Sequence, residues 1–130
     1  LKYLSHLLKK RSTIFIISDF YDPKDFFEAV KILKHKHDVI AVILRDDADF
    51  NVPDIGFIPF YDAENDKVVW IDTSNKKVME KFRKTSEAFD NKLEKQFKSA
   101  GVDFMKLYCG QPFYKKLMSF FRMRERRLAK

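Results

Sequence analysis

The chain has 130 residues, of which 45% are hydrophobic and 15% aromatic, and its net charge is +7. This size and composition suit one globular domain and exclude intrinsic disorder. The single cysteine, Cys109, excludes a disulfide scaffold and a cysteine-based zinc site within one chain, and no apolar run reaches the roughly 20 residues that cross a bilayer.

The first strand is predicted over residues 13–18, after a leucine-rich helix end within residues 1–10. Its apolar run lacks polar alternation, which predicts a strand buried on both faces. Asp19 follows directly, at the edge of a parallel sheet where ligands bind. Asp22 and Pro23 then predict the start of a helix, with Asp22 as its N-cap.

A βαβ unit is completed by the segments that follow. The helix runs to about residue 36 and a second buried strand covers residues 38–44, so the two strands should be parallel with a right-handed crossover. The loop over residues 45–56 holds Asp46 and Asp47. Together with Asp19 and Asp22 they could form an acidic rim that attracts cations; the alternative is a solvated polar loop.

A hairpin is predicted over residues 57–61 and 67–71, at a sheet edge because Pro59 cannot donate a ladder hydrogen bond. A long helix over residues 75–99 follows, capped by Thr73 or Ser74 and ended by Gly101. Residues 102–108 predict a third parallel strand.

The last helix, which Pro112 opens, is strongly basic. Residues 113–130 hold seven basic residues and one acidic residue, so this segment carries +6 of the net +7. Arg122, Arg124, Arg126 and Arg127 could bind an anion, a nucleic acid or an anionic membrane surface. The alternative is a solvated face on a helix whose apolar side docks on the sheet.

Two other candidates are weak. His35 and His37 lie where a helix ends and have no apparent third ligand, so a zinc site is not expected. No histidine is near Cys109 in the sequence, so a catalytic thiol is not expected either.

An ordered set of segments resembles the C-terminal part of the domain of unknown function 58 family. The segments are residues 4–22, 37–42, 52–56, 61–64, 70–74 and 100–103, with the arginine-rich end. The resemblance implies a Rossmann-like, von Willebrand factor A-like three-layer α/β fold, with a mostly parallel sheet and an edge hairpin. It also implies that one or more strands precede residue 1.

Domains of this kind often hold a divalent cation through three motifs: Asp-x-Ser-x-Ser, a Thr, and an Asp after a strand. Residues 17–20 match only the third, so the resemblance implies Mg²⁺ at Asp19 in an intact protein and no tightly bound metal in this chain. It also implies a MoxR-type AAA+ ATPase as a partner.

The function expected from these observations is that of a non-enzymatic protein-interaction domain spanning residues 1–130. A partner carboxylate would complete the coordination of Mg²⁺ near Asp19. The alternative is an anion- or nucleic-acid-binding module built on the basic helix, although nucleic acid is the less favoured partner. A hydrolase with Asp19 as nucleophile is disfavoured because the Asp-x-Asp pattern is missing.

Two further expectations concern location and assembly. The cytoplasm is expected, and a membrane anchor upstream of residue 1 stays open. An exposed edge on the first strand predicts self-association.

Overall fold

The computed structural model describes residues 7–21, 26–62 and 65–129. The chain divides into two compact units: residues 1–45 with 93–130, and residues 46–92. The predicted Asp22 cap lies outside the described residues, as does most of the helix expected within residues 1–10. This division does not show whether the two units fold together, so the expectation of a single domain over residues 1–130 stays a prediction.

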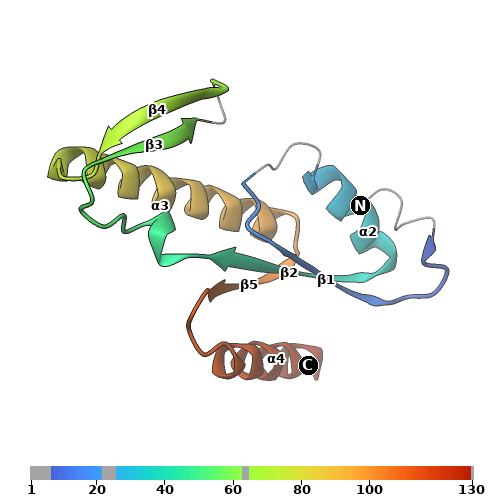
Figure 1. Ribbon diagram of the computed structural model, residues 1–130. Helices are drawn as coiled ribbons and strands as arrows, with labels where there is room; N and C mark the ends of the chain where they lie inside the picture. The colour runs from blue at the N-terminus through green and yellow to red at the C-terminus, as the bar shows by residue number, and fades with distance from the viewer. Residues whose placement is uncertain (1–6, 22–25, 63–64, 130) are drawn as a thin grey trace. The chain divides into compact units, whose positions relative to one another are not determined.

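The first unit is built on a parallel sheet of three strands. These are β1 (Thr13–Ser18), β2 (Asp38–Arg45) and β5 (Asp103–Tyr108), in the order β1-β2-β5. Helix α2 (Phe26–Lys36) and the end of α3 (Lys76–Ser99) cover one face, and α4 (Tyr114–Leu128) covers the other (Figure 1). The predicted α/β class, with a mostly parallel sheet between helices, is therefore confirmed.

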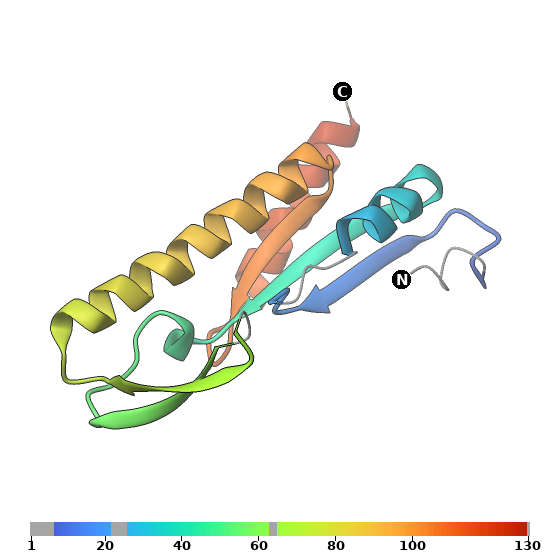
Figure 2. The same ribbon diagram turned by 90° about the horizontal axis from the view of Figure 1, so that it is seen from above.

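Strand β1 departs from the prediction. It was expected to be buried on both faces, but it lies at the outer side of β2 (Figure 2). Its side chains alternate between exposed and half-buried. The expectation is wrong because the core residues that α4 buries on this face lie on β2 and β5, while β1 meets the helix through the rings of Phe15 and Phe121 and stays partly exposed. The strand buried on both faces is β2.

Two apolar layers hold this sheet. On the α4 face, Phe120 packs with Ile40, Val42 and Met105. On the opposite face an aromatic cluster forms, in which the rings of Phe20 and Phe97 meet at 5.2 Å. Alternation along β2 therefore supplies both layers, which is why its sequence is continuously apolar.

Two predicted helix ends have different outcomes. Gly101 has φ +61° after α3, which confirms the expected left-handed cap, and the Lys34 ammonium donates to the Ala100 carbonyl at 3.0 Å. The N-cap expected at Thr73 or Ser74 is wrong. The side chain of Asn75 accepts from the backbone N–H groups of Lys77 and Val78 instead.

The second unit contains β3 (Phe57–Asp62) and β4 (Lys67–Asp72), a short 3₁₀ turn, η1 (Asp47–Asp49), and most of α3. The hairpin is confirmed, but it forms a separate two-stranded antiparallel sheet, so its expected place at the edge of the parallel sheet is wrong. Phe60 packs edge-on against Phe82 of α3, with ring centroids 5.3 Å apart. This helix, rather than a neighbouring strand, supports the hairpin.

Candidate functional site

Asp19 lies in a tight turn at the end of β1. Its carboxylate accepts from the backbone N–H of Tyr21 at 3.3 Å and from the hydroxyl of Ser18 at 3.4 Å. The Ser18 hydroxyl oxygen in turn accepts from the backbone N–H of Phe20, whose φ is +57°. The exposed carboxylate therefore stabilises the turn that ends the strand.

Arg45 lies beneath this turn and was missed by the sequence reasoning. Only 1% of the residue is exposed, and its guanidinium donates to the carbonyl oxygens of Asp19 and Leu44 and stacks on Tyr21 at 4.8 Å. The sequence feature that could have revealed Arg45 is a single cationic residue at the end of an otherwise apolar strand. A fixed positive charge here offsets the charge of Asp19 and weakens its attraction for a cation.

Among the described residues, the oxygen ligands near Asp19 do not make a complete Mg²⁺ site. Magnesium needs several oxygen ligands in near-octahedral geometry, and no group of three His, Cys, Asp or Glu residues gathers within the described part of the chain. Asp22 lies outside that part. Mg²⁺ at Asp19 in an intact protein therefore stays a prediction of the family resemblance.

The other acidic residues have local roles. Asp46 accepts from the N–H of Ala48 at 3.0 Å, and its own N–H donates to Asp49 at 2.8 Å, which forms a capping box at η1. Asp47 accepts from the side chain of Asn51 at 2.9 Å. These residues belong to the second unit, so their grouping with Asp19 stays a prediction.

The four arginines of α4 divide into two pairs. Arg124 forms a two-pronged contact with Asp38, at 2.6 and 2.8 Å, and approaches Asp103 at 3.5 Å. Arg127 contacts Asp103 at 2.8 Å. These contacts tie the helix to the first residues of β2 and β5.

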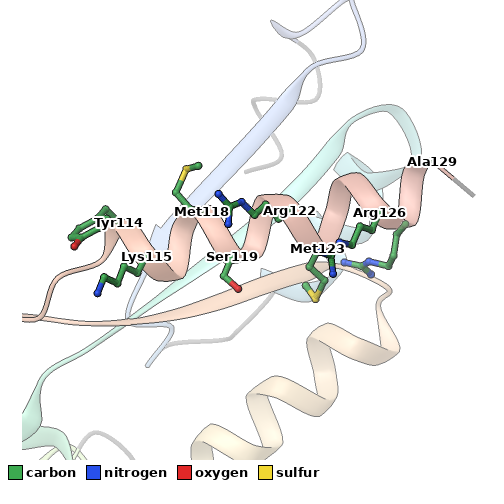
Figure 3. A pocket seen from close by; sticks show the side chains of 9 residues that line it. Tyr114, Lys115, Met118, Ser119, Arg122, Met123, Arg126 and Ala129 are labelled. Carbon is green, nitrogen blue, oxygen red and sulfur yellow. The ribbon is translucent and has the colours of Figure 1, made fainter.

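Arg122 and Arg126 lie on the opposite side of α4, and Lys115 joins them at helical spacing. We call these three cations the outer stripe. Met118 and Met123 flank it, and together these side chains line a shallow hollow on the helix (Figure 3). Arg127 also lines this hollow, so three of the four predicted arginines border it, and anion binding itself stays a prediction.

The hairpin carries a second surface that the sequence reasoning missed. Residues directly opposite in an antiparallel pair share one face of the ribbon. Phe60 with Val69 faces the supporting helix, so the pairs on either side of it lie on the outward face. We call this the hairpin face; its apolar members are Phe57, Pro59, Tyr61, Val68 and Trp70.

The hairpin face is widely exposed, with 69% of Phe57 and 65% of Trp70 accessible to solvent. The hydroxyl of Tyr61 donates to Asp66, and this hydrogen bond raises the pKa of Tyr61 above its usual range. The sequence feature that could have revealed this face is the lack of polar alternation in both strands. A two-stranded ribbon that is apolar on both faces leaves one of them uncovered when a helix packs on the other.

Within the described ranges, no helix is both long and apolar enough to cross a membrane.

An uncharacterized protein of Mycobacterium avium, MAV169, is 25% identical over 118 residues, which are 91% of this chain and 69% of that protein. The uncharacterized proteins Mb1516 of Mycobacterium bovis and Rv1480 of Mycobacterium tuberculosis are 32% identical over 57 residues, 44% of this chain and 18% of theirs. No solved structure matches the chain. The family model described as protein of unknown function DUF58 matches residues 1–92, and the chain belongs to this family.

Proposed function

We propose that the chain is a non-enzymatic protein-interaction domain and that the hairpin face is its binding surface. The observation that carries the proposal is the contiguous exposure of five apolar side chains on one side of the ribbon. Apolar patches of this kind mark interaction sites, and tryptophan and tyrosine are the residues that most often dominate binding energy.

The surface is backed on its other side by a contact with α3. Pro59 lies opposite Trp70, and Phe60 anchors the other side of the same strand on Phe82. A partner would therefore meet exposed aromatic side chains on a ribbon that α3 contacts from the other side. Asp72, at the end of β4 and opposite Phe57, provides a polar border to this face.

The partner implied by the family resemblance is a MoxR-type AAA+ ATPase, and we keep it as the proposed partner. Because Asp19 alone does not complete a Mg²⁺ site, binding by this chain should not depend on the metal. Metal assistance belongs to an intact protein that supplies the other ligands.

The experiment is calorimetric titration of the chain with the MoxR-type ATPase of its own organism. Trp70→Ala should weaken binding about tenfold or more, because truncating a central aromatic anchor costs over 1 kcal/mol. Tyr114→Ala removes an equally accessible aromatic ring from α4 and is the matched control, with unchanged affinity expected.

Each part of the proposal can fail separately. If Trp70→Ala binds the ATPase with wild-type affinity, the hairpin face is not the binding surface. If the wild-type chain does not bind the ATPase, this protein is not the partner. A loss of affinity in chelator, or in Asp19→Ala, would show that the metal acts already in this chain. We expect chelator and Asp19→Ala to lower affinity only in an intact protein that supplies the other metal ligands.

The alternative function is anion or nucleic-acid binding by α4, which the cationic outer stripe favours. Replacing both Arg122 and Arg126 with Ala should lower affinity for a short DNA duplex and flatten its salt dependence by about one unit per lost phosphate contact. Lys77→Ala with Lys81→Ala removes the same charge from α3 as the control. Fluorescence anisotropy over a salt series measures both, and equal effects of the two double variants would contradict a specific site.

A further inference from the structure

The outer stripe of α4 presents positive charge that the fold does not use. Lys115, Arg122 and Arg126 are exposed, and none of them forms an ion pair with a described residue. Glu125 is the one acidic residue within residues 113–130. Like charges on neighbouring turns of a helix repel one another, so this face is complementary to an anionic partner.

Methionine side chains border the stripe on both sides. Met118 is 53% exposed and Met123 is 49% exposed, and both line the same hollow as the cations (Figure 3). A helix face that combines cations with long apolar side chains matches the boundary between lipid headgroups and acyl chains. Nucleic acid would engage the cations through its phosphates and would leave the methionines without a partner.

Further strands of an intact protein would not cover this face. They would join the sheet at one of its edges, β1 or β5. Helices packed on such strands would lie beside α4 in its own layer, whereas the outer stripe points away from the sheet. A segment placed over the stripe would bury three cations, which is costly unless carboxylates pair with them.

We propose that the outer face of α4 binds the surface of a membrane that contains anionic lipid. The helix lies along the bilayer, its three cations contact the headgroup phosphates, and Met118 and Met123 enter the apolar boundary. Phe120 and Leu117 already hold the helix on the sheet, so binding needs no folding step. Each cation near an anionic leaflet strengthens binding about fivefold, so the stripe contributes about 100-fold.

The first experiment is co-sedimentation of the whole chain with vesicles. Wild type should bind vesicles of phosphatidylglycerol and phosphatidylcholine about 100-fold more tightly than vesicles of phosphatidylcholine alone. Replacing both Arg122 and Arg126 with Ala should lower the affinity for the anionic vesicles about 25-fold. Lys77→Ala with Lys81→Ala removes the same charge from α3 and is the matched control, with unchanged affinity expected. Circular dichroism checks that all variants fold.

The second experiment separates lipid from nucleic acid. Met118→Gln with Met123→Gln keeps every charge and removes the apolar border of the stripe. Its affinity for the anionic vesicles should fall about tenfold, because two half-exposed apolar side chains no longer leave water. Its affinity for a short DNA duplex, measured by fluorescence anisotropy, should equal that of wild type.

Four results would overturn the proposal: a wild type that does not bind anionic vesicles, equal binding to neutral vesicles, an equal loss in the α3 control, or full vesicle affinity in the methionine variant. The last result would leave charge alone as the attraction and favour nucleic acid.

The proposal goes beyond the interaction function and uses a different surface. Trp70→Ala should therefore leave vesicle binding unchanged, and a loss in that variant would assign the lipid contact to the hairpin face instead. Binding of the ATPase is measured without vesicles, so each proposal can fail without the other.

Discussion

Phe20 combines a left-handed backbone with a buried aromatic ring. Its φ is +57°, a conformation uncommon for a bulky residue, and only 4% of it is exposed. The ring packs edge-on against Phe26 at 4.9 Å and against Phe97 at 5.2 Å. Burial in this cluster offsets the backbone cost and fixes the turn that carries Asp19.

Replacing Phe20 should separate these two effects. Phe20→Ala should lower the free energy of unfolding by about 3–5 kcal/mol through the lost packing. Phe20→Gly loses the same ring but relieves the left-handed backbone, so it should be about 1 kcal/mol more stable than Phe20→Ala. Urea unfolding of the three proteins measures this order. An alanine variant more stable than the glycine variant would show that the backbone is not strained.

Helix α4 serves the fold on one side and is free on the other. Phe120 and Leu117 pack on the sheet, and Arg124 joins Asp38 and Asp103, which begin two neighbouring strands. The outer stripe makes no comparable contact with the sheet. A single basic segment therefore contains structural cations and candidate binding cations, and composition alone cannot separate them.

Stability measurements should separate the two classes of arginine. Arg124→Ala should cost about 2–3 kcal/mol, less than a fully buried pair because both carboxylates are partly exposed. Arg122→Ala, the matched control on the same helix, should change stability by less than about 0.5 kcal/mol. Thermal or urea unfolding gives both values. If Arg122→Ala loses a similar amount of stability, the outer stripe also stabilises the fold.

At the scale of the whole molecule, local patterns predicted the elements better than their arrangement. Thr13–Ser18 forms the expected strand, and β1, β2 and β5 run parallel as expected. The exposure of one face of β1 was not predicted, because an apolar run looks the same whether or not a helix covers it. Which strands neighbour each other is decided by long-range packing.

The candidate site was predictable to a smaller extent. The turn at Asp19 follows from its place after a strand, but the guanidinium of Arg45 reaches it from 26 positions away in the sequence. The partners of Arg124 are 86 and 21 positions away, and no periodicity reveals such pairs. The hairpin face depends on which side of the ribbon α3 supports, and strand propensity does not contain that information.

The order of the strands has a consequence for synthesis on the ribosome. Strand β2 ends at Arg45, whereas its neighbour β5 begins only at Asp103. At about 5–20 residues per second, translation of the stretch between them takes roughly 3–11 s. Throughout that interval the nascent chain holds an apolar strand without its second neighbour, which gives a holding chaperone time to bind before the sheet can close.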